Sequence, residues 1–253
     1  MKISIIIPTY NSSKFIERCL NSIPKSEDIE VIVVDDGSTD NTVDLVQKYD
    51  NILLIKAKHK GVSNARNVGL EASSGDYITF LDSDDEYFTK GLSVIRDAVI
   101  KHPNIDIIQF NHYRKNPNNI MTLKFHNTSG IYSANKMPTL WMVVWNKVFK
   151  REAIEGIKFD TNLQHGEDEL FVLESLYKCK KIYCVDAITV LHNINTSSLC
   201  FNVVRDELKA EQYALIDFLY RCNDASLRRA VCTRMAHLWA TDTYKSVFGD
   251  KDI

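Results

Sequence analysis

The sequence predicts an α/β fold, with a mixed, mostly parallel sheet flanked by helices and a helical extension at the C-terminal end. Over the first 110 residues, short runs rich in Ile and Val alternate with segments of helical period. Such alternation is typical of parallel strands joined by right-handed crossovers. From about residue 203 to 247 the pattern is helical only. A chain of 253 residues can bury one substantial core, or form a main domain with a helical annex.

Each strand expected in the first half is a short apolar run that ends in turn residues. Glu30–Asp35 is nearly continuous in Ile and Val, as expected for a strand that is covered on both faces. Thr39 or Asp40 can cap the helix that follows it. Further strands are expected at Ile3–Pro8, Ile52–Ile55, Tyr77–Leu81 and Ile105–Phe110, and helices at 15–23, 43–49, 62–73 and 90–101.

The second half of the chain has a less regular pattern. Residues 111–130 are rich in Asn, Lys and Thr, and predict a hairpin or a loop. A helix is expected after Gly166, followed by short strands near 181–185 and 188–192. Two helices separated near Asn223–Asp224 complete the chain, with Leu208, Leu215 and Leu219 on an inward face.

Composition argues against several classes of protein. A formal net charge of −2 gives no reason to expect nucleic acid as a partner. No apolar run approaches the roughly 20 residues that span a bilayer, and no secretory leader is expected. Because none of the six cysteines forms a Cys-x-x-Cys pair, buried reduced thiols in a cytoplasmic protein are favoured over disulfides or a zinc site.

Two acidic clusters follow expected parallel strands, at the strand ends where open α/β sheets bind ligands. The first, Asp35–Asp40, could equally be turn chemistry at the start of a helix. The second, Asp82–Glu86, holds four carboxylates in five residues, which repel one another unless a cation compensates. It therefore predicts a divalent ion, Mn²⁺ or Mg²⁺, that bridges to a diphosphate, with a solvated acidic turn as the alternative.

The sequence lacks the usual glycine-rich anion sites. No Gly-x-Gly-x-x-Gly follows the first strand, and no Gly-x-x-x-x-Gly-Lys occurs in the chain. Dinucleotide enzymes and P-loop enzymes bind their phosphates with these motifs. A metal ion held by aspartates is the substitute that this sequence offers.

Five strings, in their order and spacing, resemble family 2 glycosyltransferases of the GT-A fold over roughly residues 1–195. The strings are Pro8–Asn11, Val34–Asp40, Gly61–Gly69, Leu81–Asp85 and Gly166–Asp168. The resemblance implies a GT-A domain at 1–199, with a nucleotide-sugar-binding half at 1–110 and an acceptor half at 111–199, and leaves 200–253 as the helical extension.

The same resemblance implies an activity. The enzyme would be inverting, and would transfer a sugar from a nucleotide-diphosphate donor, a UDP-sugar, to a hydroxyl of a saccharide or lipid-linked saccharide. Bacterial surface-polysaccharide assembly is the implied setting, and the expected location is the cytoplasm, including the inner face of the membrane.

The resemblance also implies a nucleotide pocket. Tyr10 would stack on the base, and Asp36 would accept the imide N–H of a uracil. Arg66 would lie near the base or the phosphates. Core packing is the alternative for Tyr10, and a surface ion pair is the alternative for Arg66. The full set implied for the nucleotide is Pro8, Thr9, Tyr10, Asp36, Arg66, Asp82 and Ser83.

Asp168 is the general base that the resemblance implies, with Glu167 beside it to bind an acceptor or donor hydroxyl. A hydroxyl is a weak nucleophile, so proton removal during attack helps by roughly 10²–10⁴-fold. Direct in-line attack then inverts the anomeric carbon. The alternative is that both residues simply begin a helix, where acidic side chains suit the positive end of the dipole. The two interpretations are compatible.

The resemblance also implies a metal site, and two further features resemble the family less closely. Asp84 would hold the metal ion, and His192 would contact the metal ion or the diphosphate, although an isolated His is more often structural. The Asn/Thr/Ser-rich segment after His192, with Ser197 and Ser198, favours the functional interpretation. Trp145-Asn146-Lys147 resembles a short motif before the base, where Lys147 could meet a phosphate or support the acceptor site. A packing role is the alternative.

Several alternatives remain open from the sequence. The C-terminal helices could pack on the core, form a homodimer, or lie against a membrane that carries a lipid-linked acceptor. A non-catalytic sugar-nucleotide-binding or scaffold protein of the same fold is a second possible function. A sugar-nucleotide pyrophosphorylase is a third, but its Gly-rich loop after the first strand is replaced here by Pro8–Asn11.

Overall fold

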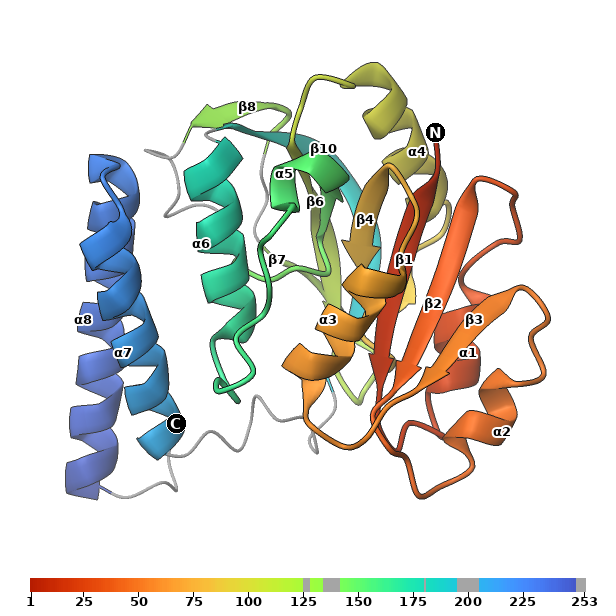
Figure 1. The fold of residues 1–253 in the computed structure, drawn as a ribbon, viewed down its shortest axis with the longest axis horizontal. Helices are drawn as coiled ribbons and strands as arrows, with labels where there is room; N and C mark the ends of the chain where they lie inside the picture. Colours follow the sequence, from red (N-terminus) through yellow and green to blue (C-terminus); the bar gives the residue numbers. More distant parts are fainter. Residues whose placement is uncertain (125–127, 134–141, 180, 195–204, 249–253) are drawn as a thin grey trace.

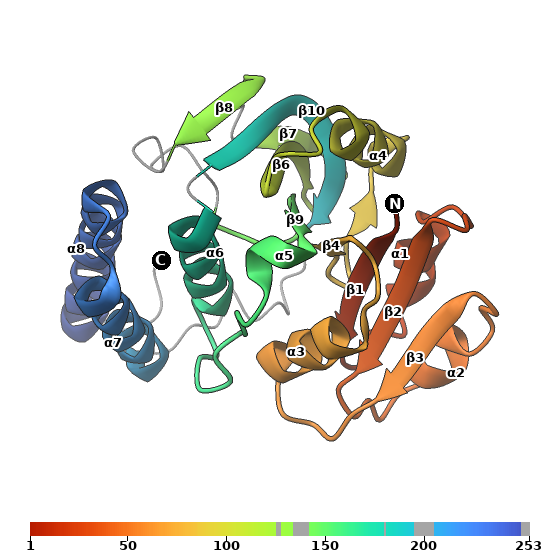
Figure 2. The ribbon, with the colours of Figure 1, turned by 45° about the horizontal axis from the view of Figure 1, so that its top comes forward.

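The computed structural model describes residues 1–124, 128–133, 142–179, 181–194 and 205–248. The strands in these ranges form one mixed sheet with the order β3-β2-β1-β4-β9-β6-β10-β5, in which β7 also pairs with β6 and β8 with β10. Helices cover both faces of this sheet, and two long helices stand at one side of it (Figures 1 and 2). The predicted α/β class is confirmed.

The N-terminal part of the sheet is parallel. β1 (Ile3–Thr9) lies between β2 (Ile29–Asp35) and β4 (Tyr77–Phe80), and β3 (Ile52–Lys56) pairs with β2. Every residue of β1 is buried, which explains its unbroken apolar run. The predicted strands of this part are confirmed, and each differs by one residue at one end.

Alternate residues of β1 face two different layers. Ile5 and Ile7 pack with residues of α1 (Ile16–Asn21), α2 (Thr42–Val46) and α4 (Gly91–Lys101). Ile6 packs on the opposite face, close to Gly69 of α3 (Val62–Ala72). Both views place α3 on the face opposite α1 and α2 (Figures 1 and 2).

The second part of the sheet is mixed. β6 (Ile107–Lys115) lies between β9 (Lys147–Lys150), which is antiparallel to it, and β10 (Lys181–Asn193), which is parallel. β9 is also antiparallel to β4 and joins the two parts. The shorter strands β5 (Glu86–Tyr87), β7 (Met121–Lys124) and β8 (Gly130–Ser133) are antiparallel to their neighbours.

Two details of this part differ from the sequence prediction. The strands expected at 181–185 and 188–192 are one strand, β10, whose pairing with β6 shifts in register between Val185 and Ile188. An irregular position of this kind interrupts the apolar alternation, so one strand appears as two in the sequence. β6 runs to Lys115, five residues beyond the expected end, because its polar end pairs with β7 in the predicted hairpin.

The C-terminal helices pack on the core of the domain. α5 (Arg151–Ile154) precedes α6 (Glu167–Cys179), and α7 (Arg205–Arg221) and α8 (Ala225–Phe248) lie beside α6 (Figure 1). Leu208 and Leu215 are buried, and belong to the same apolar cluster as Phe80 and Phe171. Leu219 is partly buried against that cluster, so the predicted inward face is confirmed.

Two further expectations concern membrane-spanning helices and the state of the cysteines. None of the helices in the described ranges combines the length and the apolar character needed to cross a bilayer. Cys19, Cys179, Cys184, Cys222 and Cys232 are free thiols. Cys200 and the segment with Ser197 and Ser198 lie outside the described residues.

Candidate active site

A single buried arginine joins two motifs that are far apart in the sequence. The guanidinium of Arg66, on α3, is 4% exposed. Its Nη2 donates to Asp82 Oδ1 at 3.0 Å, directly after β4. Its Nη1 donates to Asp168 Oδ1 at 2.7 Å and to Glu167 Oε1 at 3.0 Å, at the start of α6. The acidic segment and the proposed base therefore lie on the same side of the molecule, around one cation.

Arg66 is not the surface ion pair that the sequence left open. Its side chain also lies over the ring of Phe159, with 5.3 Å from the guanidinium carbon to the ring centroid. Removing a charged group from water is costly unless it is paired. The three carboxylates supply that compensation, and their charges raise the pKa of Arg66 despite the opposing effect of burial.

Asp168 lies in a site with little solvent. Its side chain is 16% exposed, and its Oδ2 accepts the backbone N–H of Val144 at 3.3 Å. Burial raises the pKa of Asp168, and the charges of Glu167 and Asp82 add to the rise, against the lowering effect of Arg66. A carboxylate with a raised pKa is a stronger base once it is ionised, which suits general base catalysis.

The acidic segment after β4 turns sharply and is held from behind. The backbone N–H of Asp85 donates to the carbonyl of Asp82 at 3.0 Å. Arg18, on α1, donates from Nη2 to the carbonyl of Asp84 at 2.6 Å, and its Nε lies 3.5 Å from Glu86 Oε1. Asn193 Nδ2 donates to the same Asp84 carbonyl at 3.1 Å. These contacts fix the backbone of Asp84 and leave its carboxylate to other partners.

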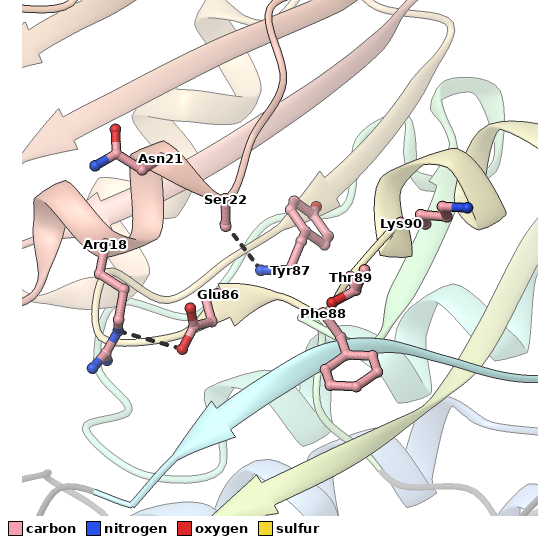
Figure 3. Close-up of a pocket in the computed structure, with 8 residues that line it drawn as sticks. All are labelled: Arg18, Asn21, Ser22, Glu86, Tyr87, Phe88, Thr89 and Lys90. Carbon is pink, nitrogen blue, oxygen red and sulfur yellow. Dashed lines mark hydrogen bonds and ion pairs between the residues drawn. The ribbon is translucent and has the colours of Figure 1, made fainter.

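A surface pocket of about 590 Å³ adjoins this segment (Figure 3). Arg18 and Glu86 form one wall, where their ion pair is visible, and the N–H of Tyr87 donates to Ser22 Oγ at 3.0 Å. The pocket is also lined by Asn21, Phe88, Thr89 and Lys90. Of the acidic segment only Glu86 lines this pocket, and Asp82, Asp84 and Asp168 do not.

Asp85 has a role that the sequence did not reveal. Its side chain is fully buried, and it accepts the backbone N–H of Asn193 at 2.7 Å. His192 Nδ1 lies 3.0 Å from the Asp85 carboxylate, and the imidazole stacks on Trp145 with ring centroids 5.2 Å apart. Burial alone would lower the pKa of His192, but Asp85 and the nearby charges of Asp82 and Asp84 outweigh it and raise the pKa.

The donor set around Asp84 fits a divalent cation. Burial raises the pKa of Asp84 to about 7, and the charges of Asp85 and Asp82 contribute. Within the described ranges, no side chain donates to its carboxylate, and no group of three or more His, Cys, Asp or Glu forms a metal cluster. Mg²⁺ and Mn²⁺ commonly take only one or two protein carboxylates together with substrate phosphates. An acidic group without a side-chain donor, near a histidine that Asp85 orients, suits such a site.

The predicted nucleotide residues lie at the ends of β1 and β2. The ring of Tyr10 is 45% exposed and stacks on His59, with centroids 4.2 Å apart, so it is not a core residue. Asp36 is buried, and accepts the backbone N–H groups of Lys60 and Gly61 at 2.9 and 2.8 Å. Asp36 thus holds the loop before α3, a contact that the sequence did not predict. Thr9 and Ser83 are buried as well, and Pro8 lies in β1.

Lys147 is placed differently from a phosphate ligand. Its side chain is fully buried in β9, and Nζ donates to the carbonyl of Val143 at 2.8 Å and to Asn146 Oδ1 at 2.9 Å. Burial lowers its pKa to about 7. These bonds shape the turn whose Val144 N–H reaches Asp168, and Trp145 packs in the core against His192. The geometry therefore favours support of the acceptor site or packing for Lys147, and not contact with a phosphate.

The chain was compared with known proteins. Residues 4–161 match the family described as Glycosyl transferase family 2. The uncharacterized glycosyltransferase EpsJ of Bacillus subtilis is 28% identical over 234 residues, covering 83% of this chain and 67% of that protein. The uncharacterized glycosyltransferase MG060 of Mycoplasma genitalium is 36% identical over 219 residues, covering 80% of this chain and 67% of that protein.

A third relative has a known structure. The poly(ribitol-phosphate) beta-N-acetylglucosaminyltransferase TarS of Staphylococcus aureus is 31% identical over 193 residues, or 72% of this chain, but this match spans only 34% of TarS. The crystal structure of TarS 1–349 in complex with UDP-GlcNAc has a TM-score of 0.76 and 23% identity, covering 97% of this chain and 73% of that one. This likeness confirms the GT-A fold. The family match extends over most of the parallel half and the acidic motif, and the chain belongs to glycosyl transferase family 2.

Proposed function

We propose that the protein is an inverting glycosyltransferase that transfers a sugar from a UDP-sugar to a hydroxyl group of a saccharide or lipid-linked saccharide. The observation that carries the proposal is the Arg66 guanidinium, which joins Asp82 of the donor motif to Asp168 of the base motif. A binding protein without catalysis would need the first motif, but it would have no use for a buried carboxylate of raised pKa beside it.

The donor nucleotide would lie along the ends of β1, β2 and β4. The exposed ring of Tyr10 offers a stacking surface for the base, and Asp36 stands at the neighbouring strand end. Asp36 Oδ1 accepts the Lys60 N–H and has a further lone pair for the uracil imide, whereas Oδ2 accepts the Gly61 N–H and also lies 2.9 Å from His59 Nδ1. The relative TarS has been crystallised with UDP-GlcNAc and with UDP, which supports a UDP-sugar as donor here.

Asp84 would hold the divalent ion, Mn²⁺ or Mg²⁺, with His192 beside it. When bound, the ion would neutralise the charge that develops on the departing diphosphate. Asp85 would keep the His192 ring oriented through its Nδ1. Arg18 and Asn193 would keep the Asp84 backbone in place from the other side.

Asp168 would take the proton of the acceptor hydroxyl as the oxygen attacks the anomeric carbon. Arg66 and the Val144 N–H hold both of its oxygens, and Glu167 would bind a hydroxyl of the acceptor or the donor. Attack in line with the departing UDP inverts the configuration. The relatives named for poly(ribitol-phosphate) act on a polyol phosphate polymer, so a hydroxyl of a surface polymer is a further acceptor of the same chemistry. We infer that the reaction takes place in the cytoplasm, where UDP-sugars are present, at the inner face of the membrane when the acceptor is lipid-linked.

The test is UDP release from UDP-GlcNAc and from UDP-glucose in the presence of Mn²⁺, with UDP binding measured by calorimetry. Asp168→Asn should lower turnover by roughly 10²–10⁴-fold, as expected for the loss of a general base, and should retain UDP binding. Asp84→Ala should abolish both turnover and metal-dependent UDP binding. Asp97→Asn, an exposed position on α4, is the control that should change neither.

Each assignment can fail separately. Metal-dependent UDP binding that persists in Asp84→Ala would remove Asp84 from the metal site. Full turnover in Asp168→Asn would remove the base. A protein that binds UDP with Mn²⁺ but releases none from any donor, with or without acceptor, would be the non-catalytic alternative.

A further inference from the structure

The segment that begins α6 has two sides with different partners. Glu167 and Asp168 reach Arg66 on α3. His165, two residues before this pair, and Glu169, directly after it, reach the C-terminal helices instead. The proposed base therefore lies on a short piece of backbone that is held from two directions.

The contacts to the C-terminal helices form one connected cluster, which we call the α6–α8 ion cluster: His165, Glu169, Glu211 and Arg234. His165 Nδ1 lies 2.6 Å from Glu211 Oε2, on α7. Arg234, on α8, donates from Nη2 to Glu211 Oε1 and from Nε to Glu169 Oε2, both at 2.8 Å. One arginine thus joins α8, α7 and the first turn of α6.

The cluster is largely removed from solvent. The side chain of Glu211 is 1% exposed, and that of Glu169 is 13% exposed. Burial raises the pKa of Glu169, while Arg234 opposes the rise. Burial would also raise the pKa of Glu211, but the hydrogen bond to His165 and the charge of Arg234 outweigh it and lower the pKa. With His165 protonated, two cations balance the two carboxylates.

Gly166 brings α7 into direct contact with the backbone in front of Glu167. Its φ of +79° favours glycine, and a Cβ built there would lie 2.5 Å from Glu211 Cγ. No other residue fits this position without moving Glu211. The side chain of Glu211 therefore packs against the chain two residues before Asp168, and also accepts two hydrogen bonds at its carboxylate.

Such a cluster is an expensive way to obtain stability. Desolvation offsets most of what a buried ion pair gains, and apolar residues of similar size often serve as well or better. What the cluster does provide is a fixed geometry, because charged hydrogen bonds are short and directional. In a catalytic site, a displacement of about 1 Å can cost about 10²-fold in rate.

We propose that Glu211 and Arg234 are positioning residues, which hold the start of α6 so that the Asp168 carboxylate meets the acceptor hydroxyl in the productive orientation. This inference rests on the proposed role of Asp168. It gives the C-terminal helices a task in the reaction that does not require them to touch either substrate.

The chain offers a matched control for Arg234. Arg221, on α7, also bridges to α6, with 2.7 Å between its Nη2 and Glu174 Oε1, and it pairs with Asp217 on its own helix. Glu174 lies six residues after Asp168, which corresponds to about 9 Å along a helix. Because Arg221 is 51% exposed and Arg234 is 30% exposed, a purely structural role predicts a larger loss of stability at Arg234, but no loss of kcat in either folded variant. Positioning predicts a loss of kcat at Arg234 alone.

The experiment compares Arg234→Met, Arg234→Lys, Glu211→Gln and Arg221→Met in the full chain, with UDP-GlcNAc or UDP-glucose and Mn²⁺. Arg234→Met and Glu211→Gln should lower kcat by about 10- to 100-fold and leave the donor KM within about twofold, since the donor site is intact. Arg234→Lys, which keeps the charge, should recover part of kcat. Arg221→Met should leave kcat within about twofold.

The outcomes separate this inference from the proposed function. Folded Arg234→Met and Glu211→Gln with wild-type kcat, beside an inactive Asp168→Asn, would overturn the positioning role alone. An equal loss of kcat in Arg221→Met would overturn it as well. Wild-type kcat in Asp168→Asn would overturn both. Circular dichroism shows whether Arg234→Met folds. If it does not, Arg234→Lys and Glu211→Gln decide the matter by the same comparison, a lowered kcat at an unchanged donor KM.

Discussion

Replacing Arg66 by methionine is the most direct test of how the site is built. Arg66 is the cation shared by Asp82, Glu167 and Asp168, at N–O distances between 2.7 and 3.0 Å. Arg66→Met keeps most of the volume of the side chain, but it removes the guanidinium that lies over Phe159 and leaves three carboxylates without that partner. Removing one partner of a buried ion pair costs roughly 3–5 kcal/mol, and we expect a loss of unfolding free energy of that size near pH 8.

The loss should depend on pH in a defined direction. Burial raises the pKa of Asp168 even with Arg66 present, and removal of the cation raises it further. A carboxyl group with a raised pKa in the folded state destabilises the fold above its unfolded pKa, and this cost disappears as the pH falls and the group binds a proton. The difference between wild type and Arg66→Met should therefore be smaller at pH 5 than at pH 8.

Urea unfolding at several pH values measures this difference. Arg151→Met is the control, because Arg151 donates to the Gly75 carbonyl and to Ser73 Oγ, and its loss should vary little with pH. The unfolding free energy of Arg66→Lys should fall between those of wild type and Arg66→Met, because one ammonium lacks the planar fork that serves several carboxylates. A loss below about 1 kcal/mol at pH 8, or one that grows towards pH 5, would refute the reasoning.

Two further predictions concern stability. Gly166→Ala should destabilise the protein more than Gly156→Ala, because both glycines have φ of +79° but only Gly166 has no space for a Cβ. Equal losses in thermal unfolding would contradict the contact between Gly166 and Glu211. At Glu30, hydrogen bonds from Lys2 and two serines outweigh burial and lower the pKa from 4.5 to about 2. The stability that Glu30 contributes is thus present above pH 4.5 and lost towards pH 2. Glu30→Gln should therefore flatten that part of the acid unfolding curve. An unchanged curve would contradict the lowered pKa of Glu30.

The parts of the fold that could be predicted are those with local signals. The unbroken Ile and Val runs of β1 and β2 required a sheet covered on both faces, and the helical spacing of Leu208 and Leu215 gave the inward face of α7. β10 was divided in two because its shift in register near Val185 breaks the alternation that identifies a strand. Pairing order was not readable either: β9 joins β4 to β6, and nothing in its four residues indicates those neighbours.

The candidate site also has residues that the sequence predicts and contacts that it does not. Strand ends and turn residues mark Asp82 and Asp84 locally, whereas Asp168 was named through the resemblance to the family. The sequence named Arg66 only as a nucleotide residue and did not predict its contacts with Asp82 and Asp168. Arg234 was missed, because it has no sequence feature that connects it to Glu169, 65 residues away. Asp85 was visible in the acidic string, but its bond to His192 spans 107 residues and depends on where β10 ends.

The sequence left two interpretations of Glu167 and Asp168, as the start of a helix or as part of a catalytic site, and their partners bear on that choice. The first turn of α6 does hold both, together with Glu169, where the helix dipole favours negative charge. That effect amounts to roughly 0.3–1 kcal/mol for an exposed residue, and it requires no further partner. Here burial raises the pKa of both Asp168 and Glu169, so the dipole does not offset their desolvation. Two arginines from different helices, Arg66 and Arg234, supply the remaining compensation from opposite sides. A turn that served only to begin a helix would be more stable with its acidic side chains in water, and the burial of these carboxylates is consistent with a site that uses a fixed, poorly solvated base.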